Sequence, residues 1–140
     1  MKSIIPMEVV RLDEENSYHL FVTGNINGKT CDLLIDTGAS QTVFDIAVIP
    51  EIPKEAQPEI HSAGINAGEV ATGFGIIRSF KIGKLKKKEW QVVLMDMSYI
   101  NSIYRRFTSK QVVGLIGSDF LLAHQSVINY KKRHLVIRTA

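Results

Sequence analysis

The sequence predicts an all-β domain with a barrel-like arrangement of strands. Short β-rich segments alternate with turn residues along most of the chain, and only one segment, near the C-terminus, has clear helical signals. Strands and long helices do not alternate, which disfavours a parallel βαβ architecture. The 140 residues contain no Pro-, Gly- or Ser-rich linker. We therefore expect one domain over residues 1–140, in which residues 1–16 form a possible N-terminal arm.

Charge gives little support for nucleic-acid binding. The formal net charge is +3, and the excess of Lys and Arg is concentrated at residues 84–88, 105–106 and 131–133. Each cluster falls at an expected turn or loop, and no aromatic residues are interleaved to form a base-stacking surface. We interpret the clusters as solvated turns that protect sheet edges from aggregation, and we expect no nucleic-acid partner.

Disulfides, metal sites and membrane segments are not indicated either. Cys31 is the only cysteine and cannot form a disulfide within the chain. The four histidines lack metal-ligand spacing, so we expect no metal and no other cofactor. No signal segment and no stretch of 18 apolar residues occurs. We expect a cytoplasmic protein without a membrane partner.

The expected strands follow from β-rich runs separated by turn residues. They cover residues 18–26, 29–35, 42–44, 80–83, 90–95, 126–130 and 134–138. The strongest turn signal is Asn27-Gly28, which predicts a tight hairpin between the first two strands. Glycines spaced through residues 60–77 predict a further, mobile hairpin. Prolines within residues 46–60 disfavour a long helix or strand, so we expect a surface loop there.

Two segments near the C-terminus remain. Residues 99–110 show no clean periodicity, so we expect a loop there with at most one turn of helix. Residues 119–124 predict a helix, with Ser118 as its cap and Asp119 at the positive end of the helix dipole.

The most distinctive chemistry lies in the sequence LLIDTGAS, where polar and small residues directly follow an apolar run. Residues 33–35 predict a strand buried on both faces, so Asp36 emerges at a strand end in apolar surroundings. Gly38 permits a tight turn there. The small Ala39 and Ser40 leave space beside the carboxylate for a ligand or another chain.

Two motifs resemble those of the retropepsin-like aspartic proteases. The first is Asp36-Thr37-Gly38, and the second is Leu115-Ile116-Gly117, far downstream. The similarity extends from about residue 18 to residue 137. It implies a closed, barrel-like retropepsin (acid protease) fold with one short C-terminal helix, in which the second motif threads behind the first.

The resemblance also implies roles for individual residues. Asp36 would be catalytic, and Gly38 and Ala39 would support its loop. Thr37 would hydrogen-bond across to the same loop of a second chain and hold the two carboxylates level. The glycine-dense hairpin would be the flap that closes over the substrate. Its substrate-binding residues would be Gly64, Ile65, Asn66 and Ala67.

One Asp36 cannot perform aspartic proteolysis, which needs two carboxylates around one water. No second Asp-Thr/Ser-Gly occurs, and neither Asp96 nor Asp119 begins a comparable loop. We therefore expect a homodimer in which a two-fold axis pairs Asp36 with its copy. Two ionised carboxylates about 3 Å apart would repel by roughly 5 kcal/mol at an effective dielectric near 20, so one proton must be shared. Residues 134–139 or 7–10 could supply strands to the dimer's sheet, or could be edge strands within the chain.

These features predict an aspartic endopeptidase that hydrolyses peptide bonds of an extended polypeptide substrate. Such a substrate would pair its backbone with strand edges and place its side chains in apolar pockets. Two alternatives stay open. One is a catalytically silent dimer of the same fold that binds peptides, and the other is a basic β-barrel that binds nucleic acid. Steep salt dependence of binding would indicate the latter.

Overall fold

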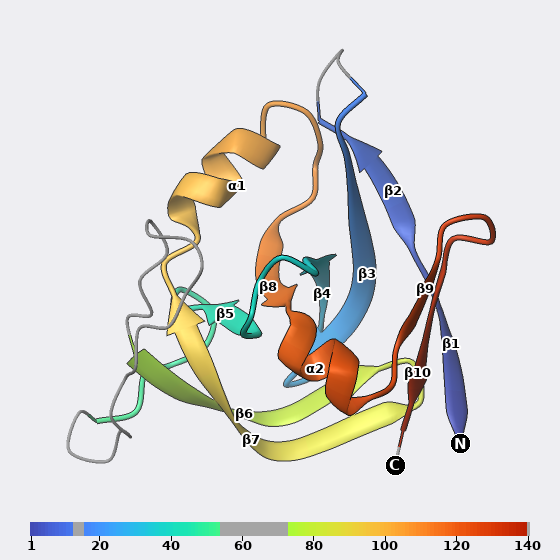
Figure 1. Ribbon diagram of the computed structural model, residues 1–140. Coiled ribbons are helices and arrows are strands. Elements are labelled where there is room, and N and C mark those ends of the chain that lie inside the picture. The colour runs from blue at the N-terminus through green and yellow to red at the C-terminus, as the bar shows by residue number, and fades with distance from the viewer. Residues whose placement is uncertain (13–15, 54–72, 140) are drawn as a thin grey trace.

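The computed structural model describes residues 1–12, 16–53 and 73–139. Twelve elements occur in these ranges, and all but two are strands (Figure 1). In chain order they are β1 (Lys2–Pro6), β2 (Glu8–Arg11), β3 (Tyr18–Ile26), β4 (Lys29–Ile35), β5 (Val43–Asp45), β6 (Gly73–Ile82), β7 (Leu85–Met95), α1 (Ser98–Tyr104), β8 (Val112–Ile116), α2 (Ser118–Ala123), β9 (Val127–Asn129) and β10 (His134–Arg138). The predicted all-β class is confirmed.

Six strands close into a barrel. Neighbouring strands follow the order β3-β4-β8-β5-β7-β6, and β6 returns to β3 through the pairs Asn25–Lys81 and Ile26–Phe80. β2 extends the sheet along the other half of β3. The core side chains are large and apolar, and several are fully buried, among them Leu33, Phe44, Phe80, Leu94 and Ile116. The barrel-like arrangement predicted from the sequence is therefore present.

The hairpin predicted at Asn27-Gly28 also closes the barrel. Both residues have positive φ, 52° and 87°, as a tight two-residue hairpin turn requires. The Asn27 amide N–H donates to the Ser79 carbonyl over 2.8 Å, and the Ser79 N–H donates to Asn27 Oδ1 over 3.0 Å. One local turn signal thus fixes both the β3–β4 register and the β3–β6 seam.

The two ends of the chain form a second, three-stranded sheet. Its order is β1-β10-β9, with both pairings antiparallel. The expected N-terminal arm is therefore extended but not free, because β1 pairs with β10 and β2 pairs with β3. The expected closing hairpin is confirmed as β9 and β10. Residues 13–15 of the expected arm lie outside the described residues.

A helix occupies part of the segment expected to be a loop. α1 is stabilised by its buried side chains rather than by a periodic sequence pattern. Asn101 Nδ2 donates to the Val112 carbonyl over 3.0 Å, and the Val112 N–H donates to Asn101 Oδ1 over 2.7 Å. The Tyr104 ring packs edge-on against Phe21, with centroids 5.5 Å apart. Contacts with distant strands thus decide the conformation here.

The second helix begins as expected, but Ser118 is not its cap. Gly117 is the N-cap residue of α2, with no side-chain capping bond, and Ser118 is the first helical residue. Asp119 lies in the first turn, as predicted, and its carboxylate Oδ1 accepts a hydrogen bond from the Phe120 N–H over 2.8 Å. Over the described ranges, no helix is long and apolar enough to cross a membrane.

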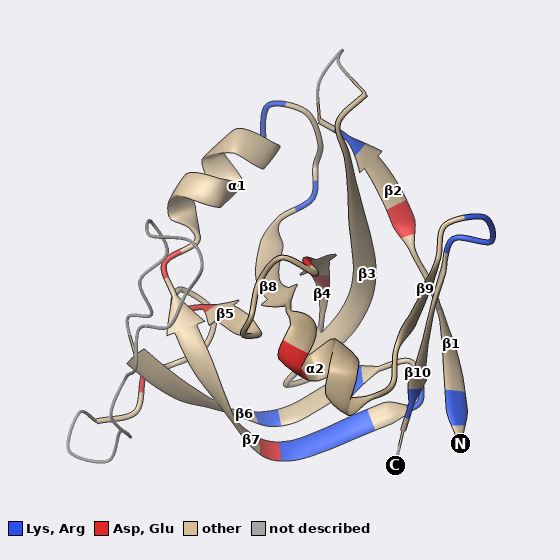
Figure 2. Ribbon diagram, viewed as in Figure 1, with Lys and Arg blue, Asp and Glu red and all other residues tan. Residues whose placement is uncertain are grey.

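The basic clusters are distributed differently from the expectation. Residues 105–106 and 131–133 lie in turns, but Lys86, Lys87 and Lys88 belong to β7 (Figure 2). The strand continues through them because β6 and β7 form one long hairpin, paired from Gly73–Leu94 to Ile82–Leu85. The Lys87 ammonium lies 5.3 Å from the centroid of the Trp90 ring, a cation–π contact.

Cys31 lies half-buried on β4. Burial raises the pKa of its thiol to about 11, and the negative charge of Asp32 adds to this effect. The thiol is therefore protonated near neutral pH and is a poor nucleophile.

Candidate active site

The loop that carries Asp36 is fixed by backbone hydrogen bonds to the segment behind it. β4 and β8 are parallel neighbours, with Ile35 beside Ile116. The Asp36 N–H donates to the Ile116 carbonyl over 3.0 Å, and the Ser118 N–H donates to the Ala39 carbonyl over 2.8 Å. The second motif therefore lies behind the first, as the resemblance implies.

Within the loop, Asp36 organises its own turn. Its carboxylate Oδ1 accepts a hydrogen bond from the Gly38 N–H over 3.0 Å, and its carbonyl accepts one from the Ala39 N–H over 3.1 Å. Asp36 is half-buried, Ala39 is buried, and Thr37 and Gly38 are exposed. Asp36 thus has a defined orientation, while Thr37 faces outward beside it.

A partly buried polar cluster holds the end of the loop, and sequence reasoning missed it. Asp119 Oδ1 accepts hydrogen bonds from the Thr42 N–H over 2.9 Å and from the Thr42 hydroxyl over 2.7 Å. The Thr42 Oγ1 in turn accepts one from the Gly117 N–H over 3.0 Å. In the sequence, this cluster is indicated only by Thr42, which follows the first motif closely, and by Asp119, which follows the second motif closely.

Gly117 is the point of closest approach between the two motifs. A Cβ atom placed there would lie 2.8 Å from the Ala39 carbonyl oxygen and 2.8 Å from backbone atoms of Gln41. These are backbone contacts, which cannot move aside as a flexible side chain can. Only glycine allows the Asp36 loop to lie this close to the start of α2.

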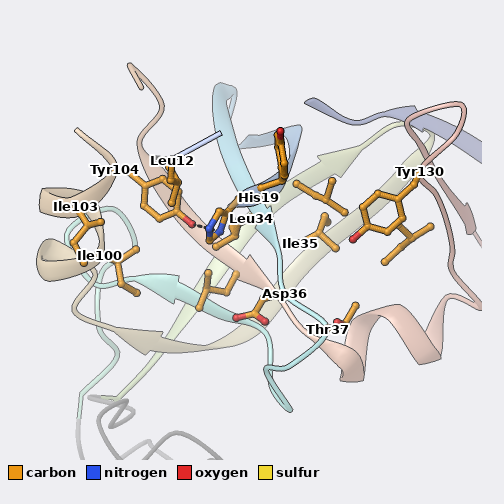
Figure 3. A pocket seen from close by; sticks show the side chains of 14 residues that line it. Leu12, His19, Leu34, Ile35, Asp36, Thr37, Ile100, Ile103, Tyr104 and Tyr130 are labelled. Carbon is orange, nitrogen blue, oxygen red and sulfur yellow. Dashed lines mark hydrogen bonds between the residues drawn. The ribbon is translucent and has the colours of Figure 1, made fainter. Parts of the chain in front are cut away.

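A pocket of about 390 Å³ opens beside Asp36 (Figure 3). Its wall is mainly apolar and is formed by Leu12, Tyr18, His19, Leu20, Leu34, Ile35, Asp36, Thr37, Ile100, Ile103, Tyr104, Leu115, Ile128 and Tyr130. Among these residues Asp36 is the only carboxylate. The pocket therefore combines one acid with a surface suited to apolar side chains.

Tyr104 and His19 form a polar pair in this wall. The Tyr104 hydroxyl lies 2.9 Å from His19 Nδ1, and the two rings meet edge-on. Burial raises the pKa of Tyr104 to about 12, and the negative charge of Asp36 contributes to the increase. The phenol is therefore neutral at any pH at which a protease would work. Neither residue was singled out from the sequence.

Replacing Tyr104 with Phe should remove a pH-dependent part of the stability. The folded state holds the phenolic proton more tightly than the unfolded chain, where the ordinary pKa is 10.0. The resulting stabilisation is complete below pH 10 and is lost as the pH rises towards 12. Urea unfolding at pH 9 and pH 11.5 should show a steeper loss in wild type than in Tyr104→Phe, by about 1 to 2 kcal/mol. Equal losses in the two proteins would contradict the raised pKa.

The other predicted site residues divide into two groups. Asp36, Thr37, Gly38 and Ala39 lie together at the pocket and its rim. The expected flap residues, Gly64, Ile65, Asn66 and Ala67, lie outside the described residues. Across the part of the chain that is described, no three His, Cys, Asp or Glu side chains gather as metal ligands would.

Comparison with known families accounts for the two motifs and for the way they lie together. Residues 22–120, which include both motifs, match the family described as aspartyl protease. The chain belongs to the aspartyl protease family. No match was found among curated proteins.

Solved structures show the same fold for this aspartyl protease family member. A retropepsin-like aspartic protease from Rickettsia conorii superposes with a TM-score of 0.52 and 14% identity, over 98% of this chain and 90% of the other. The retroviral protease-like domain of Ddi1 from Leishmania major superposes with a TM-score of 0.54 and 14% identity, over 87% of this chain and 90% of the other. The retropepsin-like fold implied by the two motifs is thereby confirmed, with two short helices instead of one.

Proposed function

We propose that this protein is an aspartic endopeptidase that acts as a homodimer, with one Asp36 from each chain. The observation that carries the proposal is the placement of Asp36 at the end of β4, in a fixed loop beside a largely apolar pocket. Asp36 is the only carboxylate among the described residues of the pocket wall. The second carboxylate that the reaction needs therefore comes from a second chain.

In the proposed mechanism the two Asp36 carboxyl groups share one proton. The ionised group accepts a proton from a water molecule as that water attacks the peptide carbonyl carbon. The protonated group donates to the carbonyl oxygen, and the leaving nitrogen is protonated as the tetrahedral intermediate collapses. The Gly38 N–H, bonded to Asp36 Oδ1, orients the carboxylate for this exchange.

The proposed substrate is an extended polypeptide. Ile100 and Ile103 of α1 and Leu12 provide apolar surface for a substrate side chain next to Asp36. The flap, with Gly64 to Ala67 at its tip, would cover the bound segment from the opposite side. Its role stays a prediction, since these residues lie outside the described ranges.

Digestion of an unfolded protein over a dilution series tests the proposal. Because each active site needs two chains, cleavage per milligram should fall as the protein is diluted below its dimer dissociation constant. A peptide with a hydroxyl-bearing carbon in place of the scissile carbonyl should inhibit, since it mimics the tetrahedral intermediate. A folded dimer that binds this peptide but cleaves nothing would identify the protein as a silent peptide binder instead.

A further inference from the structure

The pocket beside Asp36 has two unlike sides. In Figure 3, His19, Tyr104 and the two isoleucines of α1 lie on one side of Asp36, and Thr37 and Tyr130 lie on the other. The first side, which we call the α1 side, consists of Leu12, His19, Ile100, Ile103 and Tyr104. Three of these five side chains are aliphatic. A substrate side chain that enters the α1 side therefore meets a mainly apolar surface with one polar pair.

His19 has one ring nitrogen without a partner. Its Nδ1 lies 2.9 Å from the Tyr104 hydroxyl, and within the described ranges this is the only hydrogen bond that either side chain makes. In the same ranges, Ser126 Oγ is the only fully enclosed side-chain polar atom that lacks a partner. His19 Nε2, which also lacks one, is therefore not enclosed. Because His19 lines the pocket, a polar group of a bound substrate can reach this nitrogen.

Tyr104 holds the imidazole in place. The tyrosine is only 5% exposed, and its ring packs edge-on against Phe21 and His19, with centroids 5.5 and 5.6 Å away. One turn earlier on α1, the side-chain amide of Asn101 makes two hydrogen bonds to the Val112 backbone and anchors the helix. Rotation of the His19 ring would break its hydrogen bond to this fixed hydroxyl. Nε2 therefore has a defined position in the pocket.

A nitrogen in this position pairs best with a group that can both donate and accept. When the Tyr104 hydroxyl donates to Nδ1, Nε2 carries the proton and donates, and when Nδ1 donates to the hydroxyl, the neutral Nε2 accepts. A protonated imidazole donates from both nitrogens. A carboxamide can pair in all of these states, because its oxygen accepts and its nitrogen donates. A carboxylate can only accept and an ammonium can only donate, so each fails in at least one state.

The surroundings of His19 also favour a neutral group. The negative charge of Asp36 acts on the neighbouring Tyr104, whose pKa it helps to raise. The same charge would repel a substrate carboxylate bound at His19. An apolar side chain would displace water from Nε2 and leave that nitrogen without a partner, which costs free energy. A neutral side chain that forms hydrogen bonds avoids both penalties.

We propose that His19 is a specificity-determining residue, which selects a substrate side chain ending in a carboxamide, Gln or Asn, for the α1 side of the pocket. This inference rests on the proposed function, because it concerns the polypeptide that is cleaved at Asp36. The amide bonds to His19 Nε2, and the methylene groups of the same side chain contact the aliphatic residues around it. Tyr104 is a positioning residue, which acts through the His19 ring.

Cleavage of a randomised peptide mixture tests this selection. Mass spectrometry of the products should show Gln or Asn enriched at one position near the scissile bond. Matched peptides with Gln, Met or Glu at that position then measure the preference. Met has the length of Gln without its amide, and Glu has the shape of Gln with a negative charge. The value of kcat/KM for the Gln peptide should exceed each of the others at least about tenfold.

Variants separate recognition from packing. His19→Leu should reduce the Gln-to-Met ratio of kcat/KM to about one or below, because the hydrogen-bonding group is gone. Tyr104→Phe should lower the ratio in part, since the imidazole is then no longer held. The matched control is Tyr99→Phe, the same change at a residue of α1 that is 76% exposed and lies outside the pocket wall. It should keep the wild-type ratio, and circular dichroism checks the folding of all three variants.

Binding measurements distinguish a failure of this inference from a failure of the proposed function. The probes are peptides with a hydroxyl-bearing carbon in place of the scissile carbonyl, with Gln or Met placed in turn at each neighbouring position. Tighter binding of a Gln peptide, without cleavage of any substrate, would support the selection and contradict the proposed function. Cleavage without a preference for Gln or Asn, equal binding of the Gln and Met probes, or a preference that His19→Leu leaves intact would overturn the selection. A loss of kcat/KM that is equal for all peptides in His19→Leu would likewise show that the pair is only structural.

Discussion

Replacing Asp36 with Asn should reduce peptide cleavage at least about 1,000-fold, because the amide can neither accept the proton of the attacking water nor share one with its partner. The substitution is nearly isosteric, and the Asn Oδ1 can still accept the hydrogen bond from the Gly38 N–H. The loop should therefore keep its shape. The rate of cleavage of an unfolded protein, with folding checked by circular dichroism, measures the effect.

Mixing the variant with wild type separates a shared site from a site within one chain. If two chains form each site, a tenfold excess of Asp36→Asn should leave about a tenth of the wild-type activity, because most wild-type chains then pair with a variant. Full activity in the mixture would contradict the shared site. Asp96→Asn is the matched control, since Asp96 is exposed and its Oδ1 accepts a hydrogen bond from the Ser98 N–H, which an Asn Oδ1 can also accept.

Replacing Gly117 with Ala should impair both stability and activity. The new methyl group would lie 2.8 Å from the Ala39 carbonyl oxygen and from Gln41 backbone atoms, so the Asp36 loop must shift. Overpacking of this kind costs about 1 to 3 kcal/mol of unfolding free energy. A displacement near 1 Å of the catalytic group is expected to lower kcat about 100-fold. Urea unfolding and cleavage kinetics below the unfolding midpoint measure the two effects.

The neighbouring residue provides the comparison for Gly117. Ser118→Ala changes a side chain whose hydroxyl, among the described residues, makes only a long contact of 3.5 Å with the Ser40 carbonyl. It should preserve the backbone hydrogen bond from Ser118 to Ala39 and with it the activity. A Gly117→Ala protein with the activity of Ser118→Ala would show that the loop tolerates displacement.

The sequence predicts those parts of the fold that depend on residues close together in the sequence. Asn27-Gly28 specifies its turn through its own backbone preferences, and the apolar run before Asp36 specifies a buried strand. Both predictions hold in the structure. The two motifs around Asp36 and Ile116 likewise lie together, because parallel pairing of β4 and β8 brings them there.

The parts that sequence does not predict depend on distant partners. α1 is held by the hydrogen bonds between Asn101 and Val112, and nothing in its periodicity indicates them. Thr42 and Asp119 are 77 residues apart, so no local pattern connects the residues that support the Asp36 loop. The Tyr104–His19 pair in the pocket wall joins a helix to a strand 85 residues earlier. In each case the fold creates the environment that gives the residue its role.

The Asp36 loop and the residues that hydrogen-bond to it are far apart in the sequence, which also affects when the proposed activity could arise during synthesis. The bonds that hold the Asp36 loop come from Ile116, Gly117, Ser118 and Asp119. Contacts of such high sequence separation form late in folding. At translation rates of about 5 to 20 residues per second, Asp36 leaves the ribosome several seconds before the residues that position it. If the proposed function holds, a nascent chain would therefore carry Asp36 before its loop is ordered, and it should not cleave other unfinished chains at that stage.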